Sequence, residues 1–135
     1  MLGDLIGEET GTASSFHVER AGLGVKIETQ LQSTGKLLGL DIVDYATYWA
    51  ILRPDGNFDG GSNGMIVASN GEAAAYTGMG VGHMLGRGGA ATWRGAQFCV
   101  GQGPTLSKLN AIATLFEFEI DETARNMTVK LYEWK

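Results

Sequence analysis

Apolar and polar residues alternate along two segments of the chain in the pattern of a half-buried β-strand. In residues 25–32, Val, Ile, Thr and Leu take every second position, and Lys, Glu and Gln take the others. In residues 115–120, two acidic residues alternate with Leu, Phe and Ile. Successive side chains of a strand point to opposite faces, so both segments are predicted to be strands. The second is expected to form an antiparallel hairpin with residues 127–134.

Turn signals divide the middle of the chain into further strands. Residues 45–52 are aromatic and aliphatic at nearly every position, which predicts a more deeply covered strand, and the Pro-Asp-Gly turn at 54–56 ends it. Residues 64–68 form a short apolar run closed by Asn70-Gly71, a dipeptide typical of two-residue hairpins. The return strand is expected from Glu72 to about His83.

The remaining segments complete an all-β architecture. Residues 91–100 are predicted to be a strand, residues 5–20 one or two more, and the spacing after Pro104 favours one or two helical turns. The total is about eight strands, and glycines within strands favour a closed antiparallel β-barrel over a sandwich. The length predicts a single domain over residues 1–135.

Glycine falls on alternate positions at Gly78, Gly80 and Gly82, so one strand face is bare beside Tyr76. A strand face without side chains allows close approach of another backbone, tight coiling of a barrel strand, or binding of a ligand. A dinucleotide-binding loop is excluded because its third glycine would have to stand where the chain has Leu85. Coiling of the barrel is the favoured interpretation, and space for a ligand is the alternative.

Composition and charge narrow the classes of partner. A net charge of −5 and the absence of a basic stripe argue against nucleic acid. No apolar run reaches the roughly 20 residues that span a bilayer, and the acidic N-terminus does not resemble a signal peptide, so we expect a cytoplasmic protein. The only histidines are His17 and His83, which argues against a multi-histidine metal centre, and nothing in the sequence supports a mixed histidine and carboxylate site. We expect no metal and no cofactor. The single Cys99 is expected to be a buried small hydrophobe.

The candidate residues for chemistry are few. His83, Glu117 and Arg94 are weak catalytic candidates as proton donors or hydrogen-bond partners. Glu117 and Glu119 lie opposite Phe116 and Phe118, which favours a solvated face. If the aromatic face instead packed outside, the two carboxylates would point into the lumen and one pKa would rise.

An eight-stranded barrel is just wide enough for side chains or one small ligand. The bare glycine stripe favours a cavity slightly, and the aromatic residues could line it or fill it. The expected ligand-binding residues are Tyr48, Tyr76, Gly78, Gly80, Trp93 and Phe118.

Four segments carry a resemblance to a known family: residues 48–56, the Asn70-Gly71-Glu72 hairpin, residues 77–82 and Trp93-Arg94-Gly95. From about Gly22 onward the chain resembles small uncharacterised bacterial proteins that look like members of the allene oxide cyclase-like barrel superfamily. The resemblance implies an eight-stranded antiparallel barrel, often dimeric, with a lumen that accepts an apolar small molecule. It carries over no active-site residues and does not imply cyclisation.

Three functions are left open by the sequence. The first is a barrel that binds a small apolar ligand, and the second is a cyclase or isomerase that acts on a lipid- or polyketide-like substrate by confinement. The third is a structural or oligomerising barrel with a filled interior. A lumen cavity below roughly 100 Å³ would argue against both ligand hypotheses, because pockets for small molecules reach about 300 Å³ or more. Apolar residues near the C-terminal hairpin suggest a homodimer.

Overall fold

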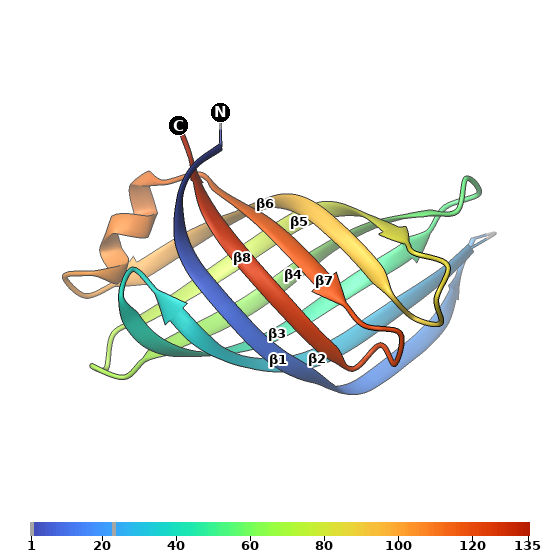
Figure 1. The fold of residues 1–135 in the computed structure, drawn as a ribbon, viewed down its shortest axis with the longest axis horizontal. Coiled ribbons are helices and arrows are strands. Elements are labelled where there is room, and N and C mark those ends of the chain that lie inside the picture. Colours follow the sequence, from blue (N-terminus) through green and yellow to red (C-terminus); the bar gives the residue numbers. More distant parts are fainter. Residues whose placement is uncertain (1, 23) are drawn as a thin grey trace.

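The computed structural model describes residues 2–22 and 24–135, which form a closed antiparallel barrel in which strands adjacent in sequence pair and the last pairs with the first (Figure 1). The barrel and its one short 3-10 helix confirm the predicted fold class. The elements are β1 Leu2–Ala21, β2 Gly24–Leu37, β3 Leu40–Leu52, β4 Asn57–Ala68, β5 Ala73–Met84, β6 Ala91–Gln102, η1 Leu106–Ala111, β7 Thr114–Ile120 and β8 Asn126–Trp134.

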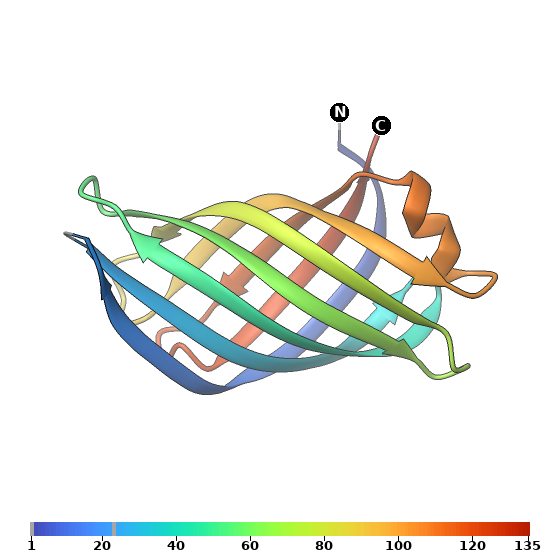
Figure 2. The same ribbon diagram turned by 180° about the vertical axis from the view of Figure 1, so that it is seen from behind.

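The N-terminal segment is one long strand. β1 pairs with both β2 and β8, and a register shift between Ala13 and Ser15 bends it where it leaves the barrel wall. Beyond that bulge, β1 and the start of β2 continue as a hairpin that projects from one end of the barrel (Figure 1). The two chain ends lie side by side at the other end, where Leu2 pairs with Trp134 (Figure 2).

β4 is longer than the apolar run at 64–68 predicts. Its first half contains Gly60 and Gly61, and Gly64 begins the predicted run; glycines are poor strand formers on their own. Aromatic rings cover these glycines: a Cβ at Gly60 would meet the Trp93 ring at 2.8 Å, and a Cβ at Gly64 would collide with the Tyr76 ring. Aromatic rings from other strands cover these glycines and so allow the strand to extend through them. The residue preferences of the segment alone do not predict this extension.

Each end of the lumen is closed by a different device. At one end, η1 places Leu106 and Leu109 against the core, and the Glu72 carboxylate accepts hydrogen bonds from the backbone N–H groups of Thr105 at 2.7 Å and Leu106 at 2.9 Å. At the other end, the Trp93 ring stacks on Phe58 with centroids 5.8 Å apart. The space between these two plugs is the interior of the barrel.

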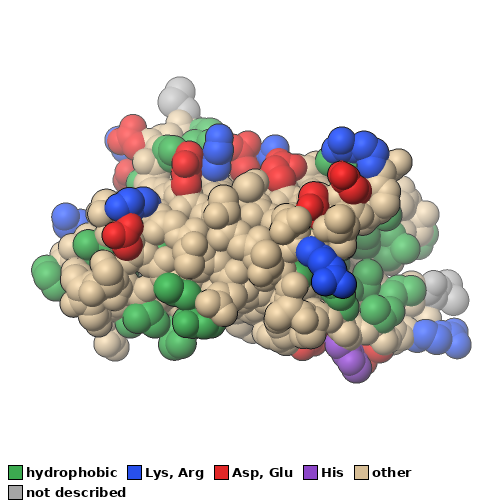
Figure 3. Space-filling model, turned by 60° about the horizontal axis from the view of Figure 1, so that its bottom comes forward, with side chains coloured by type: hydrophobic (Ala, Val, Ile, Leu, Met, Phe, Trp, Pro, Cys, Tyr) green, Lys and Arg blue, Asp and Glu red, His purple; other side chains and the backbone are tan. Residues whose placement is uncertain are grey.

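The outer surface carries an uncharged area. The middle of the face in Figure 3 holds few charged side chains, which gather toward its upper edge and its ends. One cross-strand row on this surface runs through Gln30, Thr47, Asn63 and Thr77, and Thr47 Oγ1 donates to Gln30 Oε1 at 2.6 Å. The outer face of β3 to β6 carries this uncharged row and several exposed apolar residues, and Asp41, Asp59 and Arg94 lie on the same face beyond the row.

Candidate ligand cavity in the barrel lumen

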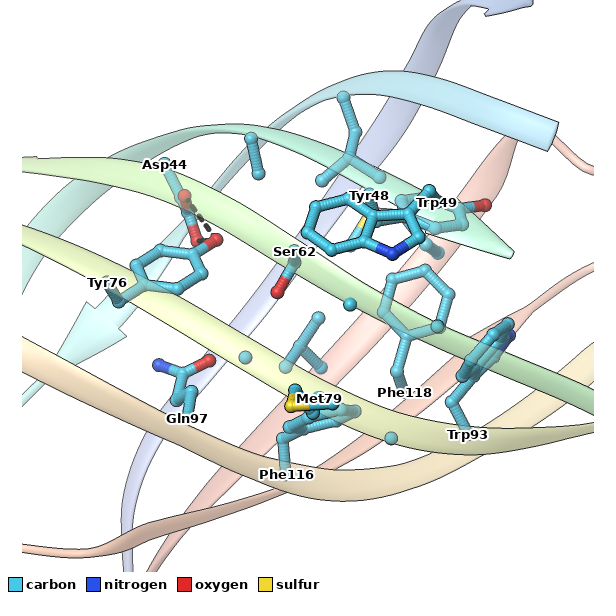
Figure 4. A pocket seen from close by; sticks show the side chains of 18 of the residues that line it. Asp44, Tyr48, Trp49, Ser62, Tyr76, Met79, Trp93, Gln97, Phe116 and Phe118 are labelled. Atoms are coloured by element: carbon cyan, nitrogen blue, oxygen red, sulfur yellow. Dashed lines mark hydrogen bonds between the residues drawn. The ribbon is translucent and has the colours of Figure 1, made fainter. Parts of the chain in front are cut away.

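A cavity of about 70 Å³ lies in the middle of the lumen (Figure 4). It has a polar end and an aromatic end, and it borders the part of the wall where β4 and β5 carry glycine. Its lining is Glu9, Leu31, Asp44, Ala46, Tyr48, Trp49, Gly60, Gly61, Ser62, Tyr76, Gly78, Met79, Gly80, Trp93, Gln97, Phe116, Phe118, Met127 and Val129.

The polar end is built around two buried carboxyl groups. Glu9 on β1 is 3% exposed and Asp44 on β3 is 5% exposed. Ser33, on the strand between them, donates from Oγ to Glu9 Oε1 at 2.6 Å. The Tyr76 hydroxyl donates to Asp44, with oxygen distances of 2.9 and 3.0 Å (Figure 4). Gly7 and Gly11 lie on the same face of β1 as Glu9, and a Cβ at Gly11 would collide with Ser33, the hydrogen-bond partner of Glu9.

Burial first, and then the charge and hydrogen bond of Glu9, raise the pKa of Asp44 to about 9, and the hydrogen bond from Tyr76 opposes this shift. Two carboxyl groups so close in a poorly solvated space cannot both ionise readily, so Asp44 keeps its proton at neutral pH. No Lys, Arg or His lines the cavity among the described residues. The pair therefore has no cationic partner in the lumen.

Two further titratable groups lie near this pair and stay protonated. Burial raises the pKa of the Tyr76 hydroxyl, and the nearby charges of Asp44 and Glu9 add to that shift. Burial likewise raises the pKa of the Cys99 thiol to about 11. Cys99 is buried and free, as expected for a small hydrophobe, and its raised pKa disfavours a nucleophilic role.

Next to the carboxyl pair, Ser62 and Gln97 flank the bare backbone of Gly78. Ser62, Gly78 and Gln97 are paired in one cross-strand row. A Cβ at Gly78 would lie 2.7 Å from Ser62 Oγ and 3.4 Å from Gln97 Cβ, so the glycine leaves the two side chains room to converge. Gln97 is 7% exposed, and its Nε2 donates weakly to Cys99 Sγ at 3.8 Å. Its amide oxygen lines the cavity without a hydrogen-bond partner among the described residues.

The opposite end of the cavity is aromatic. The Tyr48 ring meets Phe118 edge to face with centroids 5.5 Å apart, and it meets Trp93 at 6.4 Å. Burial raises the pKa of the Tyr48 hydroxyl, and the hydrogen bond between Tyr48 and Thr29 partly offsets this rise. Figure 4 shows Phe116 on the same side of the cavity as Phe118 and Trp93.

The glycine stripe of β5 faces the lumen and is largely covered by these rings. A Cβ at Gly82 would lie 2.5 Å from the Trp93 ring, and one at Gly80 would lie 2.9 Å from the Phe116 ring. Gly80 pairs with Gly60 on one side and Gly95 on the other, so three strands are bare in one row. The stripe therefore accommodates packed rings over most of its length and borders the cavity at Gly78 and Gly80.

The six residues expected to bind a ligand all line this cavity: Tyr48, Tyr76, Gly78, Gly80, Trp93 and Phe118. Ligand binding itself stays a prediction. The volume is below roughly 100 Å³, so it argues against both ligand hypotheses in the form expected from the sequence: a pocket of the usual size for a small apolar ligand, and a lumen that confines a lipid or a polyketide.

The three catalytic candidates lie on the outer surface of the barrel. Arg94 forms ion pairs with Glu119 at 2.8 Å and Glu117 at 3.4 Å, on the solvated face favoured for these glutamates. His83 Nδ1 lies 2.6 Å from Asn57 Oδ1 in an exposed pair. Strand alternation places these side chains opposite Gly82, Trp93 and Phe118, which point inward. Their catalytic roles remain untested predictions, and the barrel wall separates them from the lumen.

Sequence reasoning missed the polar residues of the lumen. Asp44 has the same strand parity as Ile42, Ala46 and Tyr48, and this could have indicated an inward carboxyl group. The signal was weak because the other face of β3 also carries Tyr45 and Trp49. Glu9 follows another glutamate, and nothing local distinguishes the inward residue from its outward neighbour.

No protein-family model matches the chain, and no curated protein sequence matches it significantly. Solved structures do share its fold. A protein of unknown function from Clostridium acetobutylicum ATCC 824 is 12% identical, with a TM-score of 0.84 over 98% of each chain. A conserved protein of unknown function from Rhodopseudomonas palustris is 13% identical, with a TM-score of 0.83 over 98% of this chain and 97% of that one.

At these identities the similarity shows the fold alone. It confirms that the chain is similar to uncharacterised bacterial barrels, as part of the sequence resemblance implied. The two proteins are described as having unknown function, so they assign no ligand or reaction. In the described residues, no helix is long and apolar enough to cross a membrane.

Proposed function

We propose that this barrel binds a small molecule in its lumen, with a polar group of the ligand at Glu9 and Asp44 and its apolar part against the aromatic rings. The carboxyl pair carries this proposal, because it is buried, borders a cavity and has no cationic side chain beside it among the described residues. Burying an acid without a counter-charge costs stability, and perturbed groups in a cavity are typical of functional sites. A purely structural barrel would be more stable with apolar residues at these positions.

The size of the cavity limits the ligand. An apolar cavity of about 150 Å³ accommodates benzene, which has six non-hydrogen atoms. On the same scale, a cavity of about 70 Å³ holds about three such atoms. The proposed ligand is therefore much smaller than the lipid- or polyketide-like substrate of the cyclase alternative, and its apolar part is one or two carbon atoms.

Native mass spectrometry of the protein purified from its own host tests this function. We expect an adduct of small mass that is lost when Glu9 and Asp44 are replaced by their amides. A protein with the bare mass that also fails to bind any small amine, alcohol or acid added at millimolar concentration would favour the filled, structural barrel instead.

An acid-catalysed reaction is the second candidate function. It is favoured by the proton that Asp44 retains at neutral pH, since a carboxyl group with a pKa of about 9 can donate a proton to a bound substrate. In such a reaction Asp44 would supply the chemistry in place of His83, Arg94 or Glu117. Catalysis requires turnover of a bound compound, and binding without any chemical change over hours would leave only the binding function.

We also propose that two copies of the barrel associate through the outer face of β3 to β6. Tyr45, Met65, Ala75 and Val100 form one cross-strand row on this face, and Met79 and Phe98 are 75% and 60% exposed. The uncharged row of Gln30, Thr47, Asn63 and Thr77 lies beside this apolar row, and a two-fold dimer would bury the same patch on each copy. The apolar patch lies on this face, whereas Phe116 and Phe118 of the C-terminal hairpin point inward.

Light scattering coupled to size-exclusion chromatography measures this association. Phe98→Glu is expected to convert the dimer to a monomer, while Val18→Glu, on the exposed hairpin outside the patch, is expected to leave it unchanged. A wild-type protein that is monomeric at 100 μM, about the concentration range of weak dimers, would contradict this proposal.

The place of the chain in the allene oxide cyclase-like superfamily is likewise a proposal. It rests on the segments of sequence that resemble those barrels and is supported by the eight-stranded closed topology. A shared fold at low identity does not carry a reaction with it.

A further inference from the structure

The hydrogen-bonding groups at the polar end of the cavity are mostly acceptors. The Tyr76 hydroxyl already donates a hydrogen bond to Asp44, and the Ser33 hydroxyl donates one to Glu9. The Gln97 amide nitrogen donates a hydrogen bond to Cys99. The Gln97 amide oxygen lines the cavity with no partner among the described residues, and so does the Ser62 hydroxyl. A ligand in this space meets carboxyl and amide oxygens, which accept hydrogen bonds, and the Ser62 hydroxyl, which can donate or accept, so a ligand that brings donors can satisfy all of these groups.

The charge of the lumen points in the same direction. Glu9 and Asp44 are the only acidic groups that line the cavity, and the lining contains no basic residue among the described residues. The other titratable groups that face the pair are Tyr76 from β5 and Cys99 from β6, and both are neutral because burial raises their pKa. Any negative charge on the pair therefore has no cationic side chain to balance it in this poorly solvated space, among the described residues.

The aromatic end fits the remainder of such a ligand. The rings of Trp93, Phe116 and Phe118 offer apolar contact to one or two carbon atoms, and aromatic rings also attract cations through their negative faces. A carboxylate with free acceptor oxygens on one side and aromatic rings on the other is complementary to a small alkylammonium ion. A small anion would meet a negative charge, and a neutral alcohol would leave that charge unbalanced.

From these contacts we infer that the lumen binds a small primary ammonium ion of about three non-hydrogen atoms, with its N–H groups toward Glu9, Asp44 and Gln97. This inference rests on the proposed function and specifies its ligand class. Gln97 is independent of the carboxyl pair, since it lies on a different strand, β6, and the residue as a whole is 7% exposed. A bound ammonium ion would give the amide oxygen of Gln97 a hydrogen-bond donor that it otherwise lacks among the described residues.

Titration of ¹⁵N-labelled protein with ethylammonium chloride tests the inference, with ethanol as the neutral isostere and sodium chloride as the salt control. Small ligands gain limited affinity per atom, so we expect a Kd of about 1 mM for ethylammonium. The amides of Gly78 and Gln97 are expected to shift, with at least tenfold tighter binding than ethanol. Sodium chloride is expected to shift neither amide.

A matched pair of double variants separates the lumen charge from the general charge of the protein. Glu9→Gln with Asp44→Asn neutralises the lumen, and Glu8→Gln with Asp41→Asn removes two acidic residues from the outer faces of the same two strands. The first pair is expected to lose the preference for ethylammonium over ethanol, and the second is expected to keep it. If the lumen variant does not fold, a pH series on the wild type replaces it.

In that series the affinity for ethylammonium should rise between pH 6 and pH 9, as the carboxyl pair loses its proton, while the affinity for ethanol should stay constant. Equal or tighter binding of ethanol, or an affinity for ethylammonium that does not change with pH, would overturn the ammonium inference and leave the proposed function standing. If neither compound shifts Gly78 or Gln97, both the inference and the proposed function fail.

Discussion

The variant Asp44→Asn tests the shared proton of the lumen directly. Asparagine has the shape of a protonated aspartate, accepts the hydrogen bond from Tyr76 and can donate to Glu9 as the protonated acid does. It differs in having no proton to lose. The variant therefore removes one titration from the interior while it keeps the packing.

The direction of the pH effect follows from the raised pKa. In the unfolded chain Asp44 titrates near its usual value of about 4, and in the folded barrel it titrates at about 9. Between these values the folded state holds a proton that the unfolded state has released, so the stability of the wild type falls as pH rises. Below about pH 4 both states are protonated, and above about pH 9 both are ionised, so the contribution is constant there.

The magnitude is one proton across that window, which corresponds to about 1.4 kcal/mol per pH unit. From pH 5 to pH 8 the wild type is expected to lose about 4 kcal/mol relative to Asp44→Asn. The free energy of unfolding by urea at each pH measures this difference. Asp41→Asn, which removes an exposed acid paired with Lys36 on the outer face of the same strand, is the control and should parallel the wild type.

Parallel stability curves for the wild type and Asp44→Asn between pH 5 and pH 8 would refute this reasoning, because they would mean that Asp44 is ionised in the folded barrel. Since the two carboxyl groups are coupled, the proton belongs to the pair. Glu9→Gln is therefore expected to flatten the pH dependence in the same direction.

Three further predictions concern packing and capping. Gly80→Val places a Cβ 2.8 Å from the Arg94 carbonyl oxygen and 2.9 Å from the Phe116 ring, so it should destabilise the barrel by about 1–3 kcal/mol in thermal unfolding. The control Ala75→Val, on the outer face of the same strand, should change the stability little. Unchanged stability of Gly80→Val would mean that the glycine stripe faces open space. Thr114 is 1% exposed and its Oγ1 has no hydrogen-bond partner among the described residues, so Thr114→Val should stabilise the protein by about 1 kcal/mol, and a loss of stability would reveal a partner for that hydroxyl. Glu72→Ala removes the acceptor of the Thr105 and Leu106 amides, so hydrogen exchange at these two amides should accelerate while that of β8 stays slow; unchanged exchange would show that η1 does not depend on Glu72.

The fold was predictable from the sequence because its signals are local. A strand is indicated by the alternation within residues 25–32 and within residues 115–120. A chain reversal is indicated by the turn residues at Pro54 and at Asn70-Gly71. The aromatic and glycine lining was predictable for a related reason, since the alternate glycines had to face a surface shared with Tyr76. The extent of β4 was not predictable, because its glycines are covered by Trp93 from β6 and Tyr76 from β5.

The polar end of the site depends on contacts between distant strands. Closure of the barrel arranges β1, β3 and β5 around one lumen and so brings Glu9, Asp44 and Tyr76 together. The spacing of these residues along the chain does not predict their proximity. For the same reason His83, Arg94 and Glu117 attracted notice as chemically capable residues, although their strand parity places them on the outer wall. Asp44 was the one inward acid that parity could have indicated.

Intermolecular nuclear Overhauser effects between ethylammonium and the protein test the central claim most directly, because they locate the bound ion. We predict contacts from the ethyl protons to the ring protons of Phe116 and Phe118, and their loss in the Glu9→Gln, Asp44→Asn variant. Contacts confined to outer residues such as Phe98 and Val100, or no contacts at a concentration tenfold above the expected Kd of about 1 mM, would contradict the claim that the lumen is a binding site.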